Sequence, residues 1–209
     1  MGLHVWYELG LRSPATFDDA IEAMTRLHEF AQGIGFTGDD HFPAVSELEI
    51  GGPGDQFPEM LDGIAATCWV RFTVMPGRGC ETAHFSLAER PTGGPQAFAG
   101  SLGFCKTQYA HGFGREHFLA CHRGLIALLD RARELGVLSD VRDDGGYWNS
   151  RSVESLMDRL AEHQRVVAAF AGCFKDAIER QLGANAGVVI APITKEPTFE
   201  HLEAEGRSG

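Results

Sequence analysis

The chain has 209 residues, of which 44% are hydrophobic, and a formal net charge of −11. This length favours one α+β domain, which we expect over residues 1–193, followed by a mobile charged tail over residues 194–209. The acidic balance argues against a nucleic-acid partner and against an anionic membrane surface, because both attract clusters of lysine and arginine.

The cysteines indicate the compartment. They are odd in number, and no two of them form a C-x-x-C pair, which excludes a disulfide framework and a zinc ribbon. The N-terminus lacks a basic region followed by an apolar run, so we expect no secretory signal. Together these features predict a soluble, cytoplasmic protein with reduced thiols, and no motif indicates a metal or a cofactor. The five cysteines are Cys68, Cys80, Cys105, Cys121 and Cys173.

The first half of the chain predicts a strand, a helix and a meander. Apolar residues alternate over residues 3–11, which is the period of a half-buried strand. Thr16 and Asp19 have the spacing of a capping box, and the apolar stripe that follows predicts a helix ending at the glycines 33 and 35. Residues 45–50 favour a short edge strand. Three further alternating runs predict the strands of the meander, over residues 69–75, 80–88 and 97–105.

The third strand of this meander has one face made almost wholly of small residues. The face includes Ala99, Gly103 and Cys105, while Phe98, Leu102 and Phe104 have the opposite parity. Small side chains let another backbone or group approach closely. We therefore expect either a packed helix or a ligand on that face.

The second half predicts two long helices. Residues 115–135 carry a core-facing stripe that ends at Gly136, and residues 137–141 favour a short strand. A helix of about 30 residues then ends before Gly183, and residues 188–193 favour a last strand. The middle of the long helix is apolar on every side, so it either crosses a core or contacts a partner. We expect a homodimer through the region between Val166 and Phe174.

The order of the elements predicts the fold class. It is α+β, with a mostly antiparallel sheet, helices packed on one face and an added long C-terminal helix. The arrangement is a variant of the ferredoxin-like sandwich. The alternative is two lobes that meet near residues 103–114.

The segment from Gly103 to Arg115 is the first candidate site. Lys106, Thr107 and Tyr109 follow a strand end, and Arg115 opens a helix whose free N–H groups attract anions. These side chains and N–H groups predict that the segment binds a small anionic ligand. The segment does not have the sequence pattern of a P-loop or of the G-x-G-x-x-G motif. A plain strand–loop–helix connection is the structural alternative.

The same segment carries groups for nucleophilic chemistry. Cys105 stands next to Lys106, with His111 and His117 near in sequence, and a cation or imidazole lowers a thiol pKa. His117 and Cys121 are four residues apart and share a helix face, which is weak evidence for a metal site. A buried, inert cysteine is the structural alternative.

A second candidate site lies around residues 143–148. Tyr147 and Trp148 follow two adjacent acids, Asp143 and Asp144, and could rim a ligand pocket. Acids in a turn face water in most proteins, and aromatic residues anchor such loops to the core.

Three classes of function follow. The first is a protein that binds a small anionic ligand at the strand–loop–helix, with Tyr147 and Trp148 added to its binding residues. The second is a cysteine- or histidine-dependent enzyme of unknown substrate. The third is an acidic protein–protein interaction module. A thiol–imidazole pair in contact would favour the second.

Overall fold

The computed structural model describes residues 3–52, 55, 67–90, 96–182, 193 and 199–208. The chain divides into two compact units, one of residues 4–144 and one of residues 1–3 with 145–209. Among the described residues, no helix has both the length and the apolar character needed to cross a bilayer. The predicted last strand at residues 188–193 lies almost wholly outside the described residues.

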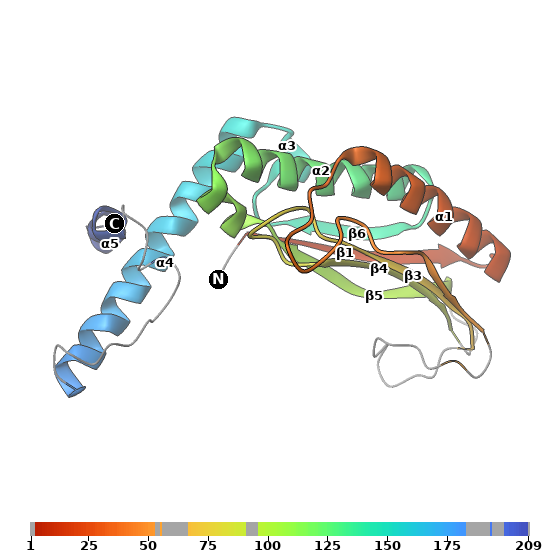
Figure 1. Cartoon of the computed structure of the whole chain (residues 1–209), viewed down its shortest axis with the longest axis horizontal. Helices are drawn as coiled ribbons and strands as arrows, with labels where there is room; N and C mark the ends of the chain where they lie inside the picture. Colours follow the sequence, from red (N-terminus) through yellow and green to blue (C-terminus); the bar gives the residue numbers. More distant parts are fainter. Residues whose placement is uncertain are drawn as a thin grey trace. The chain divides into compact units, whose positions relative to one another are not determined.

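The unit of residues 4–144 is an antiparallel sheet with two long helices. Its elements are β1 (His4–Arg12), α1 (Phe17–Ile34), β2 (Glu49–Gly51), β3 (Trp69–Val74), β4 (Ala83–Glu89), β5 (Gln96–Lys106), the 3-10 helix η1 (Gln108–Phe113), α2 (Arg115–Glu134) and β6 (Leu138–Asp143). The strand order is β2-β3-β4-β5-β1-β6. Figure 1 shows α1 and α2 over one face of the sheet.

The predicted α+β class, with helices on one face of an antiparallel sheet, is confirmed. β1 lies between β5 and β6 and is antiparallel to both. β5 and β6 are therefore parallel to each other, and α2 connects them by crossing over β1, which is a split βαβ unit. β4 and β1 are both antiparallel to β5, so they are parallel to each other. β2 and β3 extend this ferredoxin-like core at the β4 edge.

The core forms where the apolar faces of α1, α2 and the sheet meet. The buried set includes Tyr7, Phe72, Phe85, Met24, Leu27, Phe118, Leu125 and Leu128. Three of these residues form a ladder across the sheet, with ring centroids 5.0 Å apart for Tyr7 and Phe85 and 5.1 Å apart for Phe72 and Phe85. At the start of α1 the predicted capping box is present, since Thr16 and Asp19 bond each other's backbone N–H groups.

The small face of β5 accommodates the core rather than a ligand. Gly103 is paired with Tyr7 on the neighbouring strand, and a Cβ at residue 103 would lie only 2.3 Å from the Tyr7 ring. The tyrosine ring lies over the glycine, and its hydroxyl donates to the carbonyl oxygen of His84, 2.8 Å away. Small residues on this face are therefore required by an aromatic side chain of β1.

The C-terminal unit is helical where it is described. It contains α3 (Tyr147–Ser150), α4 (Val153–Leu182) and α5 (Phe199–Ser208). The long helix α4 was predicted from the sequence and is confirmed. α5 lies inside the segment predicted as a mobile tail, and its Phe199 packs with Ala168 and Ala171 of α4. Arg207 adds an ion pair to Asp176, with 2.9 Å between nitrogen and oxygen.

Candidate functional site

Thiol and imidazole groups from two distant segments meet at the start of α2. The β3–β4 connection is the turn at residues 75–82, and it carries Cys80. α2 carries His117 and Cys121 one helical turn apart, so their side chains share a face. The turn packs directly on this face, because a Cβ added to Gly77 would lie 2.8 Å from both the Cys121 sulfur and the His117 ring. The tertiary fold therefore brings two cysteines and one histidine together.

The imidazole of His117 contacts the sulfur of Cys121. The distance from His117 Nε2 to Cys121 Sγ is 3.6 Å, and the same nitrogen lies 2.9 Å from the carbonyl oxygen of Arg78. A carbonyl oxygen can only accept a hydrogen bond, so Nε2 carries the hydrogen. His117 therefore donates this hydrogen to the Arg78 carbonyl, and its ring lies against the Cys121 sulfur.

The thiols of Cys80 and Cys121 interact, and their pKa values shift in opposite directions. The bond to Cys121 is the largest cause of a raised pKa at Cys80, followed by burial. The bond from Cys80 is the largest cause of a lowered pKa at Cys121, and burial opposes it only in part. Of the two groups, Cys121 is therefore the one that ionises first, while Cys80 stays protonated. Cys121 is 2% exposed, whereas Cys80 is partly exposed.

Cys105, the predicted nucleophile, has a different environment. Its side chain is fully buried, and its S–H donates to the carbonyl oxygen of Glu81, with 3.0 Å between the two atoms. Burial, followed by the negative charge of Glu81, raises the pKa of this thiol. Successive strand residues point to opposite faces, so Lys106 is directed away from the Cys105 sulfur. The Lys106 ammonium instead lies 3.3 Å from a Glu81 carboxylate oxygen.

Thr107 belongs to a buried hydroxyl–imidazole–carboxylate chain. Its Oγ1 lies 2.9 Å from Nδ1 of His122, and Nε2 of His122 lies 3.5 Å from Oδ2 of Asp143. All three side chains are inaccessible to solvent. A hydrolytic triad requires an accessible hydroxyl, so this chain connects α2 to the ends of β5 and β6 rather than acting on a substrate. Asp143, expected in a solvated turn, is the last residue of β6.

The other residues predicted for the anion site lie along η1 and the start of α2. Tyr109 is 48% exposed and Arg115 is exposed at the first position of α2. His111 is half-buried, with its ring 6.4 Å from that of Phe118. Tyr109 and Arg115 are therefore available to a ligand, whereas Lys106 and Thr107 are engaged by Glu81 and His122. Anion binding stays a prediction.

Tyr147 and Trp148 belong to the other compact unit. Both lie in α3, where Tyr147 is buried and the Arg151 guanidinium lies 4.9 Å from the centre of the Trp148 ring. Their expected role in ligand binding stays a prediction as well.

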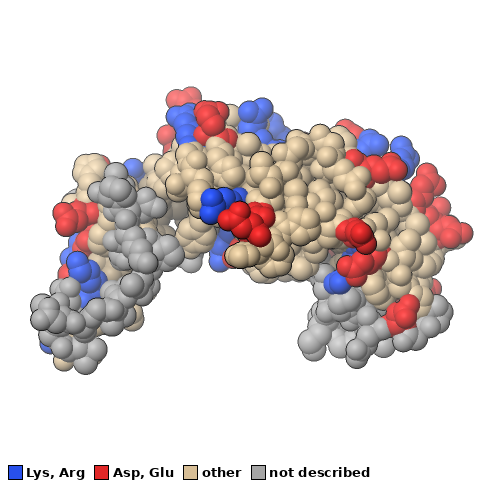
Figure 2. Space-filling model, viewed as in Figure 1, with Lys and Arg blue, Asp and Glu red and all other residues tan. Residues whose placement is uncertain are grey.

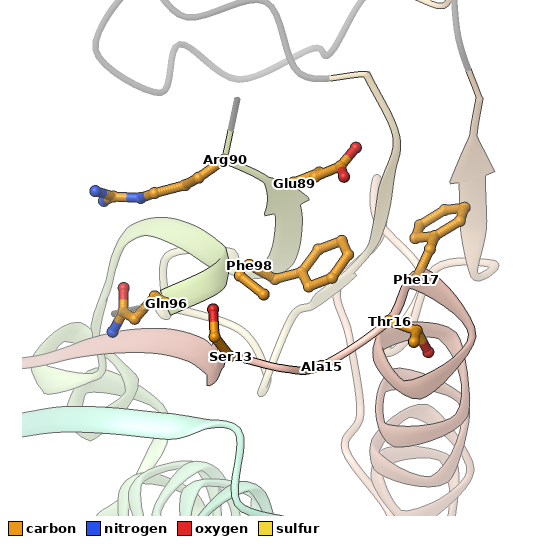
Figure 3. A pocket seen from close by; sticks show the side chains of 9 residues that line it. Ser13, Ala15, Thr16, Phe17, Glu89, Arg90, Gln96 and Phe98 are labelled. Carbon is orange, nitrogen blue, oxygen red and sulfur yellow. The ribbon is translucent and has the colours of Figure 1, made fainter. Parts of the chain in front are cut away.

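A pocket in the unit of residues 4–144 lies at the opposite end of β5. Figure 3 shows its lining between the end of β1, the start of α1 and the neighbouring ends of β4 and β5. Its volume is about 220 Å³, and it is lined by Ser13, Thr16, Phe17, Glu89, Arg90 and Phe98 among others. Glu89 is engaged by the hydroxyl of Thr67 and by the S–H of Cys68, the latter at 3.3 Å. No cysteine or histidine lines this pocket.

Surface charge bears on the idea of an acidic module. Figure 2 shows acidic and basic side chains interleaved over the face in view rather than gathered into a patch of one sign. The sheet surface opposite the helices exposes Leu102 and Phe104, with the Phe104 ring 5.2 Å from that of Trp6. An apolar cluster of three residues on a monomer surface is common and names no partner.

The weak hypothesis of a metal site at His117 and Cys121 can be compared with the geometry. In the described part of the chain, no group of three or more histidine, cysteine, aspartate or glutamate side chains is arranged to hold a metal ion. The contact between Cys80 and Cys121 was missed from the sequence. The four-residue spacing of His117 and Cys121 was the one local signal in the sequence, and it identified two of the three residues of the site.

Comparison with known proteins identifies no relative of this chain. No protein-family model matches the chain, and no curated protein and no solved structure is significantly similar to it. The candidate function therefore rests on the described residues themselves.

Proposed function

We propose that this protein acts through the thiolate of Cys121, as a cysteine-dependent enzyme in which Cys121 is the nucleophile. The observation that carries the proposal is the contact of the Cys121 sulfur with the His117 imidazole, 3.6 Å from Nε2, beside a Cys80 thiol that lowers the pKa of Cys121. The thiolate, not the thiol, is the reactive form of cysteine. The lowered pKa of Cys121 favours that form.

The roles of the three residues follow from their hydrogen bonds. His117 donates its Nε2–H to the Arg78 carbonyl, so this nitrogen has no lone pair with which to remove a proton from Cys121. Cys80 donates its S–H and stays protonated, because its own pKa is raised. Cys105 also stays protonated, which leaves Cys121 as the nucleophile of this cluster.

The proposal predicts an absorbance change that needs no substrate. A thiolate absorbs near 240 nm, so titration of the folded protein should show one thiolate forming below the ordinary cysteine pKa of about 8.5. We expect Cys121→Ser to remove this step and Cys80→Ala to move it to higher pH, because the Cys80 side chain is the largest cause of the lowered Cys121 pKa. Cys173→Ser is the control, since Cys173 is exposed on α4 and should leave the step unchanged. A protein without any step below that pH would contradict the proposal.

The lowered pKa of Cys121 also makes the stability of the fold depend on pH. A depressed folded-state pKa stabilises the fold fully above the unfolded pKa, and that contribution is lost as the pH falls through the folded pKa. The stability of the wild type relative to Cys121→Ser should therefore decrease as the pH falls below about 8.5.

We also propose that α4 mediates self-association, as the apolar character of its middle suggested. Val166, Phe170 and Phe174 recur at every fourth position, so they share one face of the helix, and all three are exposed. The rings of Phe170 and Phe174 stack with centroids 6.4 Å apart. An exposed aromatic stripe on a helix is the type of surface that a second copy can bury.

Sedimentation equilibrium at micromolar concentration tests the dimer. We expect the wild type to be dimeric and Phe170→Asp to be monomeric, because a charge at the centre of the stripe opposes burial. Lys175→Asp, a charge change at an exposed residue of the same helix outside the stripe, is the control and should remain dimeric. A monomeric wild type would overturn this second proposal.

A further inference from the structure

We propose that the sheet face opposite α1 and α2 is a docking surface for a basic amphipathic helix of a partner protein. The surface has an apolar part, made of Trp6 on β1 with Leu102 and Phe104 on β5. It also has an acidic part beside them, made of Glu8 on β1 and Asp140 on β6. The inference is independent of the proposed nucleophile, which lies on α2 over the other face of the sheet.

The strand register places these five residues side by side. Trp6 pairs with Phe104, and Glu8 pairs with Leu102, across β1 and β5. Glu8 also pairs with Asp140 across β1 and β6. Residues that pair directly share a face of the sheet. Trp6 and Glu8 alternate along β1 with side chains buried in the core, so the shared face is the one opposite α1 and α2.

The apolar part of the surface is exposed, and its rings are already ordered. Leu102 is 64% exposed and Phe104 is 44% exposed. The ring of Phe104 lies 5.2 Å from that of Trp6, and the ring of His4 stacks on Trp6 at 5.3 Å. Aromatic residues are enriched at the centres of protein interfaces, and side chains that are ordered before binding lose less entropy when they are buried.

The apolar part alone does not identify a partner, but the acids beside it determine the sign of the partner's charge. Glu8 and Asp140 occupy paired positions, and like charges directly opposite each other destabilise a sheet. In the part of the chain that the structure describes, neither carboxylate forms an ion pair. Lysine or arginine side chains of a partner would relieve this repulsion, so the complementary surface is apolar with a basic flank.

The dimensions of the surface fit one helix. Neighbouring strands lie about 4.8 Å apart, so the distance from β5 across β1 to β6 is about 10 Å. This is about the diameter of an α-helix with its side chains. A helix seated over Leu102, Phe104 and Trp6 therefore has its flank over the two acids. It would cover this sheet face as α1 and α2 cover the other one, which is a layer arrangement common in folded domains.

Titration of the full chain with a synthetic helical peptide of leucine and lysine tests the inference. A peptide with glutamate in place of each lysine is the matched probe of opposite charge. The chain has three tryptophans, so NMR of the ¹⁵N-labelled protein resolves the indole N–H signal of Trp6, which is assigned by its loss in Trp6→Phe. We expect the lysine peptide to shift this signal to saturation, and the glutamate peptide to leave it unchanged.

Two double variants separate this surface from the net charge of the chain. Glu8→Gln with Asp140→Asn should weaken binding of the lysine peptide by about tenfold, because two charge contacts at the rim are lost. Asp18→Asn with Glu29→Gln is the matched control. It makes the same change of net charge at two exposed positions of α1 and should bind the peptide as the wild type does.

The outcomes that would overturn the inference are distinct from those that concern Cys121. Equal affinities of the two double variants would show that binding follows net charge alone. Binding of the glutamate peptide, or no shift of the Trp6 signal with the lysine peptide, would also overturn the inference. A Trp6 signal that moves with the concentration of the protein itself would assign this face to a second copy instead. The thiolate step is measured without any peptide, so none of these results affects the proposed nucleophile.

Discussion

Replacing His122 with alanine is expected to lower the free energy of unfolding of the unit of residues 4–144 by about 3–5 kcal/mol. The imidazole is fully buried between the Thr107 hydroxyl and the Asp143 carboxylate, at 2.9 Å and 3.5 Å. Removing it leaves the buried carboxylate without the group that faces it, and breaking a buried pair from one side costs far more than breaking a surface pair. Chemical denaturation followed by the fluorescence of the unit's tryptophans measures the effect.

A double-mutant cycle distinguishes this pair from a general loss of packing. We expect His122→Leu combined with Asp143→Leu to be less destabilised than the sum of the two single variants, because the apolar pair leaves no buried charge. His41→Ala, at an exposed position of the same unit, is the control and should change stability by less than about 0.5 kcal/mol. Additive single effects would show that the two side chains act independently.

Replacing Phe85 with alanine is expected to cost about 3–5 kcal/mol of stability. Phe85 is fully buried at the centre of the aromatic ladder, with Tyr7 and Phe72 stacked on it. The substitution leaves a cavity lined by the rings of Tyr7 on β1 and Phe72 on β3, which are fixed on their strands and cannot collapse into it. The same denaturation measurement gives the difference from the wild type.

Phe104 provides a control with the same chemical change. It lies on β5, on the sheet face opposite the helices, and is 44% exposed. We expect Phe104→Ala to cost much less than Phe85→Ala, since its remaining contacts are with Trp6 and His4 at the surface. Equal costs for the two variants would mean that the second sheet face is buried as deeply as the first, against the one-sided arrangement of helices in Figure 1.

The candidate site could be predicted from the sequence only in part, and the reason is visible in Cys105. Its neighbour Lys106 made it the expected nucleophile, but adjacent positions in a strand face opposite sides of the sheet. The same alternation could have excluded this pairing in advance. The contact of Cys80 with Cys121 could not have been found in this way, because it depends on how the β3–β4 turn packs on α2.

The small face of β5 shows the same limit in the core. Its alternation was readable, and it left a helix and a ligand as two open explanations. Neither explanation included the ring of Tyr7, because the pairing of β5 with β1 is a contact between the beginning and the middle of the chain. The α4 helix is intermediate, since its length was predicted correctly while its packing with α5 was not.

The sequence by itself determined the elements that depend on local periodicity. These are the alternating strands, the capped helix α1, the helix α2 and the long helix α4, and their order determined the α+β class. Tertiary structure alone decided which strands are neighbours, which side of each strand is buried, and which thiols meet. Periodicity is a property of a few consecutive residues, whereas strand order and the meeting of Cys80 with Cys121 depend on packing between segments far apart in the chain.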